Sequence, residues 1–310
     1  MGEFSKYVGD VGEKIVADFL NLFGWRNMCS NKEIVCHVEE HSAKTHGIDA
    51  LFAYNSPLQK QTLISVVVSA KYSSNPYTNI RPTFKSHFKD IANAIDCYSK
   101  SHLKRNLTKE FDGSSRKTDV GVLFYINNID DETKNNIKPV ISTARLDGNL
   151  NFNTIHVVDN ERADFLFSAL GYIKKEYANA QFFCHGTTLN IGSSKSHSKI
   201  MPVEYVTSPI IPLSVELDGR RRFIFLCDFN FSRESLQLIL KLAKKLCADF
   251  SSHYEIYFKN YNNLTDTPVV DEVKMTLLHE EDDAEYPQSS QDIKITVDTY
   301  KSDFRSNKHE

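Results

Sequence analysis

Apolar residues recur along this chain with two different spacings, and each spacing predicts one kind of element. In residues 4 to 24 they recur every three to four positions, the period of an amphipathic helix, and Gly24 follows as a C-terminal cap. Residues 83 to 100 and 161 to 178 show the same period. Short apolar runs between turn-forming residues predict strands at 31 to 39, 48 to 54, 63 to 71, 119 to 128 and 153 to 159. This order predicts a mixed α/β domain over residues 1 to 180.

A second pattern begins after a segment rich in Gly, Ser and Thr, residues 185 to 199, which predicts a linker. Apolar runs at 205 to 217, 221 to 229 and 253 to 261 surround a helical stretch at 232 to 249, which predicts a small ββαβ unit, and 292 to 300 is one more strand-like run. We therefore expect a smaller α+β region over residues 200 to 300.

Composition narrows the class of protein. A content of 41% hydrophobic and 25% charged residues is that of an ordinary globular chain, and no apolar run is long enough to cross a bilayer. The first residues carry no signal-peptide pattern, and the six cysteines form no CxxC pair, so we expect reduced thiols and a cytoplasmic location. The net charge of −3 argues against coating nucleic acid through bulk charge, although the basic stretch 71 to 89 is compatible with a local groove.

Candidate chemistry lies at the ends of two adjacent predicted strands. Asp49 opens one apolar run and Lys71 closes the next. Because side chains alternate along a strand, Ser69 and Lys71 share the less apolar face of the second strand, and Asp49 shares a face with Leu51 in the first. If the strands form a hairpin, Asp49 lies beside Lys71. A carboxylate and a lysine so placed can hold a divalent cation and neutralise a developing oxyanion.

Three stretches carry a resemblance to a known superfamily. "GDVGEKIVADFLNLFGW" resembles the opening helix, "GIDALFAY" the strand with the first metal-binding acid, and "VVVSAKYS" the (D/E)xK strand of PD-(D/E)xK nucleases, which are also called restriction-endonuclease-like. The resemblance covers roughly residues 8 to 126. It implies a central mixed β-sheet flanked by helices, and Mg²⁺- or Mn²⁺-dependent hydrolysis of phosphodiester bonds. It also implies that Glu13, Asp49 and Lys71 are catalytic.

The chain departs from the superfamily pattern at Ser69, where an Asp or Glu usually provides the second metal ligand. Three explanations stay open. Glu13, which we expect on a partly buried flank of the first helix, replaces the missing acid; Ser69 and the Ala70 carbonyl suffice beside two acids; or the site is degenerate and binds without cleaving.

Residues around the site suggest how a substrate is held. We expect phosphate contacts from Arg81, in the loop before the helix at 83 to 100, from Lys85 and Lys89 on that helix, and from His46. Cysteines and histidines also occur together at Cys29, Cys36, His37, His41 and His46, but their spacings match no zinc-finger pattern, so the sequence does not favour zinc there.

These features predict a metal-dependent DNA endonuclease that resembles restriction and antiphage-defence nucleases. The C-terminal region is then expected to form a homo-oligomer, bind a partner protein or sense a target. The alternative is a degenerate nuclease-fold subunit that binds nucleic acid or assembles with a partner. Nothing in the sequence distinguishes DNA from RNA as the substrate.

Overall fold

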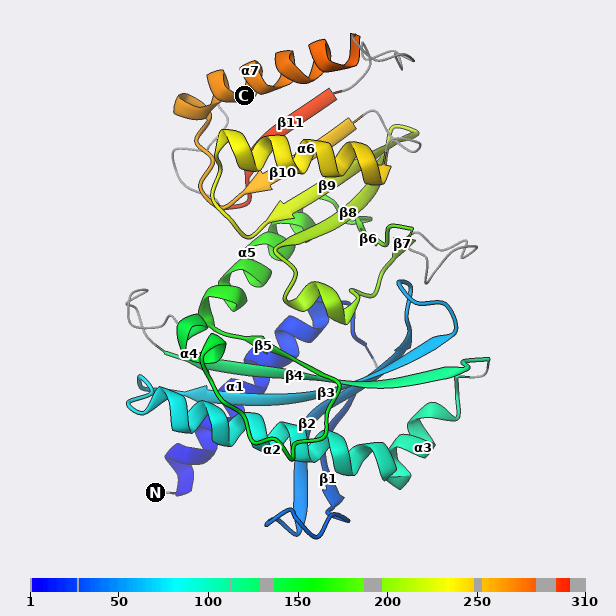
Figure 1. Ribbon diagram of the computed structural model, residues 1–310, viewed down its shortest axis with the longest axis vertical. Helices are drawn as coiled ribbons and strands as arrows, with labels where there is room; N and C mark the ends of the chain where they lie inside the picture. Colours follow the sequence, from blue (N-terminus) through cyan, green and yellow to red (C-terminus); the bar gives the residue numbers. More distant parts are fainter. Residues whose placement is uncertain are drawn as a thin grey trace. The chain divides into compact units, whose positions relative to one another are not determined.

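A computed structural model describes residues 2–26, 28–111, 113–128, 137–186, 197–247, 253–282 and 294–301. The chain forms two compact units (Figure 1). The first comprises Met1–Asp164 and Met201–Thr207, and the second comprises Phe165–Ile200 and Ser208–Glu310. The border falls inside helix α5 (Asn160–Glu176). The division into domains at 1–180 and 200–300 stays a prediction.

The first unit contains a mixed sheet whose strand order follows the chain. Within the described residues its order is β1-β2-β3-β4-β5. The strands are β1 (Cys29–Val35), β2 (Thr45–Asn55), β3 (Thr62–Ser73), β4 (Arg116–Asn127) and β5 (Thr154–Val158). The β1/β2 and β2/β3 pairs are antiparallel, whereas the β3/β4 and β4/β5 pairs are parallel. The predicted strands and the predicted mixed sheet are confirmed.

Helices cover both faces of this sheet (Figure 1). From α1 (Gly2–Leu22), the Phe19 ring packs on Phe124 with centroids 5.5 Å apart. From α2 (Ile80–Lys100), the Phe84 ring packs on Tyr125 at 5.9 Å. Because neighbouring strand residues point to opposite faces, α1 and α2 lie on opposite sides of β4. Residues 62 to 69 of β3 are buried throughout, so both faces of this part of the strand are covered.

Shorter elements complete the first unit. They are α3 (His102–Thr108), α4 (Lys138–Ser142) and the 3-10 helix η2 (Val203–Val206). Residues 201 to 207 return to this unit through specific bonds. The Trp25 indole donates to the Met201 carbonyl at 2.9 Å, and the Val203 amide donates to the Tyr54 hydroxyl at 2.8 Å. The Trp25 ring also stacks on Phe52 of β2 with centroids 5.7 Å apart, so the segment that follows α1 packs on this strand.

The second unit is built on its own mixed sheet, with the order β11-β10-β9-β8-β6-β7. Its elements are β6 (Gln181–Phe183), β7 (His197–Ser198), β8 (Ile210–Leu217), β9 (Arg220–Cys227), α6 (Arg233–Cys247), β10 (His253–Phe258), α7 (Asn263–Asp282) and β11 (Lys294–Thr299). The predicted ββαβ unit is confirmed as β8, β9, α6 and β10. Most of the predicted linker, residues 187 to 196, lies outside the described residues. Among the helices described here, none is long and apolar enough to span a membrane.

Candidate active site

The candidate site lies where β2 separates from β3. The register of β2 with β3 ends at the pair Ala50 and Val68, whereas the register of β3 with β4 continues to Ser73. Beyond Val68, a side chain takes over the hydrogen bonding of the β3 edge. The Ala70 amide donates to Oδ2 of Asp49 at 2.6 Å. The end of β3 therefore holds the Asp49 carboxylate in place through a charge-assisted bond.

A local break in strand alternation sets the direction of Asp49. Ile48 and Leu51 both belong to the core beneath α2, although strict alternation would put them on opposite faces. The break falls at Asp49 and Ala50, which both line a cavity on the α1 side. Opposite this point in β1, Asn31 has a φ of 49°, a left-handed backbone in which Asn is enriched. The expectation that Asp49 shares a face with Leu51 is therefore wrong.

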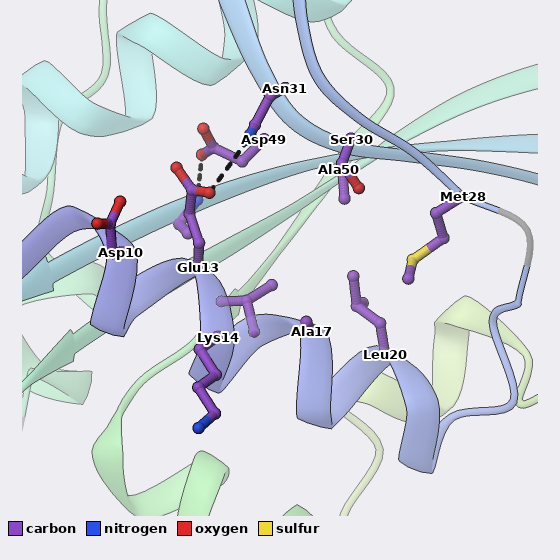
Figure 2. A pocket seen from close by; sticks show the side chains of 12 residues that line it. Asp10, Glu13, Lys14, Ala17, Leu20, Met28, Ser30, Asn31, Asp49 and Ala50 are labelled. Carbon is purple, nitrogen blue, oxygen red and sulfur yellow. Dashed lines mark hydrogen bonds between the residues drawn. The ribbon is translucent and has the colours of Figure 1, made fainter.

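Glu13 of α1 faces the same cavity. The cavity has a volume of about 310 Å³. Its polar side chains are Asp10, Glu13, Lys14, Ser30, Asn31 and Asp49. Figure 2 shows the Glu13 and Asp49 carboxylates pointing into one space while the Lys14 ammonium points away from them. The Asn31 amide donates to Oε2 of Glu13 at 3.1 Å and fixes that carboxylate. Glu13 is exposed rather than partly buried as we expected, so its charge is hydrated and accessible.

Close packing of α1 on β3 positions Glu13. A Cβ atom built on Gly12 would lie 2.7 Å from Cβ of Tyr72, closer than real Cβ contacts allow. Only glycine lets the helix approach the strand end to this distance. Glu13 is the next residue, and it is thereby placed against the tip of β3. The sequence contained this signal, because Gly12 lies inside an apolar helix period, where glycine is otherwise unfavourable.

Ser69 and Lys71 lie on the other face of the sheet. In the parallel register, Ser69 is opposite Leu123 and Lys71 is opposite Tyr125, and both partners pack beneath α2. Ser69 is 8% exposed. Among the described residues, the lining of the Glu13–Asp49 cavity includes Ala70 but neither of its neighbours in β3. The structure thus brings Glu13, Asp49 and Ala70 together, and it places Ser69 and Lys71 on the opposite face.

A carboxylate that the sequence pattern did not indicate lies on the Lys71 side. Asp90 belongs to α2, and its Oδ2 lies 3.9 Å from Nδ1 of His87. The pKa of Asp90 is lowered, first by the neighbouring His87 ring and then, against the opposing effect of burial, by the positive charge of Lys71. Asp90 is largely exposed, and it provides the α2 face of the strand end with its own acid beside Lys71.

The predicted phosphate-binding residues of α2 take part in contacts within the unit. Arg81 lies inside the helix rather than in the loop before it, and its guanidinium donates to the Thr143 hydroxyl at 3.1 Å. The Lys89 ammonium lies 3.4 Å from Asp147. Lys85 is half-buried. Contacts of these three residues with nucleic acid stay predictions.

His46 lies away from the Glu13–Asp49 cavity. It is a buried residue near the start of β2, and a ligand nitrogen of its ring lies close to ligand atoms of Cys36, His41 and Cys97. The structure therefore does not place His46 for the phosphate contact that we expected from it.

The order of elements and the strand-end carboxylates define a class. The unit contains a helix, three antiparallel strands, a second helix and two further parallel strands, with one acid in β2 and one on α1. This arrangement is a restriction-endonuclease-like nuclease core. The chain belongs to the PD-(D/E)XK nucleases, because the family model described as "GAPS4 protein PD-(D/E)XK nuclease domain" matches residues 1–162. This match confirms the superfamily resemblance. A comparison with curated proteins finds no match.

Proposed function

We propose that this protein is a divalent-metal-dependent endonuclease that cleaves DNA in the cytoplasm as an effector of antiphage defence. One observation carries the proposal. The chain belongs to a nuclease family, and its Glu13 and Asp49 carboxylates, which come from separate elements, face one cavity near the end of β3. Carboxylates converging in this way repel each other unless a cation lies between them, which favours a metal site over a structural contact.

The donor set of this cavity suits a hard cation. The N–H and C=O groups of one strand residue point toward the same neighbouring strand. Because the Ala70 amide points to Asp49, the Ala70 carbonyl is directed to the same side. Glu13, Asp49 and the Ala70 carbonyl would then hold Mg²⁺ or Mn²⁺ through oxygen alone. When bound, such an ion lowers the pKa of a coordinated water and offsets phosphate charge.

Other residues of the chain orient these groups and the substrate. Asn31 fixes Glu13, and the Ala70 amide fixes Asp49, so neither carboxylate has to be ordered when the substrate binds. We propose that Lys71 neutralises the charge of a phosphate that lies across the tip of β3. Arg81, Lys85 and Lys89 are assigned to the DNA backbone, where contacts position a substrate without reading its sequence.

The defence role and the assembly are proposed from the family description and from the sequence. The family description associates this nuclease domain with the GAPS4 protein, and the sequence resembles nucleases of restriction and defence systems. A resident nuclease has to be restrained, so we assign the second unit to self-association, to a partner protein or to target sensing.

A second candidate function is a nuclease-fold subunit that binds nucleic acid without cleaving it. The observation that favours it is Ser69, which supplies a neutral hydroxyl where the superfamily has an acid, and which lies on the opposite face from Asp49.

Supercoiled plasmid incubated with the full chain and Mg²⁺ or Mn²⁺ tests the proposal, with structured RNA as a second substrate. We expect nicking by the wild type and a loss of at least about 10²-fold in Asp49→Asn and in Glu13→Gln. Asp18→Asn is the matched control, because Asp18 is an exposed carboxylate of the same helix outside the cavity lining, and it should nick normally.

Calorimetric titration with Mn²⁺ separates the two candidate functions without needing an activator. Wild type and Asp18→Asn should bind the ion, and Asp49→Asn should not. Nucleic-acid binding without cleavage, with proteins encoded beside this gene also supplied, would favour the non-catalytic subunit. Cleavage of RNA alone would correct the substrate.

A further inference from the structure

Four metal-ligating side chains meet on the α2 side of the first unit, outside the cavity of Glu13 and Asp49. They are Cys36, just after β1, His41 in the following loop, His46 in β2 and Cys97 in α2. Each residue offers one sulfur or ring nitrogen as a ligand atom, and these four atoms all lie within 4.8 Å of one another. Cys36, His41 and His46 lie close together in the sequence, whereas Cys97 lies 61 residues beyond Cys36, so local spacing could not complete the ligand set.

The distances within the group fit a tetrahedral zinc ion. Zn–S bonds of about 2.3 Å and Zn–N bonds of about 2.0–2.1 Å imply separations of about 3.8 Å between two sulfurs and about 3.6 Å between sulfur and nitrogen. The two sulfurs, of Cys36 and Cys97, lie 3.6 Å apart. Nδ1 of His41 lies 3.4 Å from the Cys36 sulfur and 3.5 Å from the Cys97 sulfur. All three separations match the edges of one coordination tetrahedron.

The second nitrogen of His41 faces a carboxylate. Its Nε2 lies 3.9 Å from Oδ2 of Asp96, which is itself buried. The other Asp96 oxygen accepts from the Asn151 amide at 2.8 Å and lies 3.2 Å from the Lys100 ammonium. Metal-binding histidines usually direct their other nitrogen at such a group, which fixes the ring and its tautomer. Asp96 therefore provides the outer support that a metal site requires.

The burial of His46 is an independent indication of a ligand. Its side chain is 7% exposed, and within the described residues its Nε2 is buried without a hydrogen-bond partner. An imidazole nitrogen that is buried without a hydrogen-bond partner destabilises the folded state. A metal bound in the cluster would give this ring a partner.

A disulfide between Cys36 and Cys97 explains the arrangement of the four side chains less well than a zinc ion does. A disulfide needs sulfurs about 2.05 Å apart, and Cys36 and Cys97 are both free thiols at almost twice that separation. A disulfide would also leave both histidines without a role. Two thiolates and two imidazoles in a closed, largely buried group are instead the ligand set of structural zinc sites.

We propose that Cys36, His41, His46 and Cys97 bind one structural zinc ion that attaches the β1–β2 hairpin to helix α2. Four protein ligands fill the tetrahedron, so no position is left for a substrate. The attached hairpin includes β2, which carries Asp49 three residues after His46. The zinc ion thereby stabilises the strand that presents Asp49.

The full-length wild-type chain, purified without chelator under reducing conditions, provides the first test. Elemental analysis should give about one zinc per chain, and Co²⁺ exchanged into the site should show the visible bands and the sulfur charge-transfer absorption of a tetrahedral thiolate site. Neither measurement depends on a variant that folds. Removal of zinc by a strong chelator should lower the thermal midpoint, and added zinc should restore it.

Variants then assign the ligands. Cys97→Ser and His46→Ala should lose stoichiometric zinc. Asp96→Asn should keep the ion but bind it about 10- to 100-fold more weakly. Cys29→Ser and His37→Ala are the matched controls, because Cys29 and His37 lie nearby in the sequence but outside the group, and both should retain zinc.

Two results would overturn the proposal. One is a folded wild-type chain that contains no zinc and takes up neither Zn²⁺ nor Co²⁺. The other is a Cys36–Cys97 disulfide found by thiol counting in protein purified without reductant, together with the absence of metal. Plasmid cleavage is not used as a readout, so failure of the zinc site and failure of the proposed nuclease remain distinguishable.

Discussion

The Asp49 carboxylate takes the place of a strand partner for the Ala70 amide, with 2.6 Å between Asp49 Oδ2 and Ala70 N. One carboxylate oxygen completes the edge of β3, and the other is left for the cavity that Glu13 also lines. Asp49 therefore has a structural and a chemical role, and these roles can be separated by substitution.

Asp49→Asn keeps an oxygen that can accept from the Ala70 amide but removes the charge, whereas Asp49→Ala removes both. We expect Asp49→Ala to lower the free energy of unfolding by about 1–3 kcal/mol, since the amide loses its charged acceptor. Asp49→Asn should lose less than half of that, while both variants lose Mn²⁺ binding. Urea unfolding followed by fluorescence is the measurement. Trp25, the only tryptophan of the chain, is fully buried in the first unit and reports on that unit. Equal losses of stability would contradict a structural role for the bond.

Asn31 combines a left-handed backbone with a bond to Glu13, and two substitutions separate these features. Asn31→Gly accepts the positive φ but cannot hold Glu13, whereas Asn31→Ala loses the bond and strains the backbone by about 1–2 kcal/mol. We expect both variants to bind Mn²⁺ about 10- to 100-fold more weakly, and only the alanine variant to be clearly destabilised. Wild-type Mn²⁺ affinity in both variants would show that Asn31 does not orient the Glu13 carboxylate.

Two glycines of α1 provide a matched pair. Gly9 has no atom within 4 Å of an added Cβ, whereas an added Cβ at Gly12 would lie 2.7 Å from Cβ of Tyr72. Gly9→Ala should stabilise the first unit by about 0.5–1 kcal/mol through helix propensity. Gly12→Ala should destabilise it by about 1–3 kcal/mol, because the helix has to move away from β3. Trp25 fluorescence during urea unfolding measures both effects, and a stabilised Gly12→Ala would contradict the close packing.

His156 of β5 predicts a pH dependence of stability. Burial, reinforced by the nearby positive charge of Arg162, lowers the pKa of His156 from 6.5 to about 4. Between these values the folded state binds fewer protons than the unfolded state, so stability falls as the pH drops from 6.5 toward 4. The loss attributable to His156 is about 2–3 kcal/mol.

His156→Gln removes this titration. The variant should lose less stability than the wild type between pH 7 and pH 4.5, whatever its stability at pH 7. Other histidines titrate in both proteins, so the difference between the two urea-unfolding curves isolates His156. An exposed histidine changed in the same way, His102→Gln, should follow the wild type. Parallel curves for wild type and His156→Gln would contradict the lowered pKa.

Elements whose apolar residues recur at a regular spacing could be predicted from the sequence. Elements that depend on the strands or helices they pack against could not. The α1 helix and the apolar strands β3 and β4 follow from local spacing alone. The α7 helix contains Pro268 and shows no apolar stripe, so its sequence gives little periodic signal. The β6 strand has three residues and exists as a strand through its pairing with β8 and β7.

The site residues could be listed from the sequence, but the faces they occupy could not. Spacing and resemblance identified Glu13 and Asp49. The face of Asp49 depends on an interruption of alternation next to Asn31, which belongs to another strand. The zinc group depends on Cys97 of α2 meeting a distant loop. Both are long-range relationships that a local pattern does not contain.

Ser69 provides a decisive test of which sheet face carries the metal. If the ion is held by Glu13 and Asp49, Ser69→Ala should leave Mn²⁺ affinity and plasmid nicking unchanged. Ser69→Glu, which restores the acid of the superfamily pattern, should raise neither, because position 69 shares its face with Leu123 beneath α2. The new carboxylate would be buried, at a cost in stability of about 1–3 kcal/mol that should lessen at low pH as it protonates. Increased nicking by Ser69→Glu would instead place the metal beside Lys71 and Asp90, and Asp90→Asn would then abolish that gain.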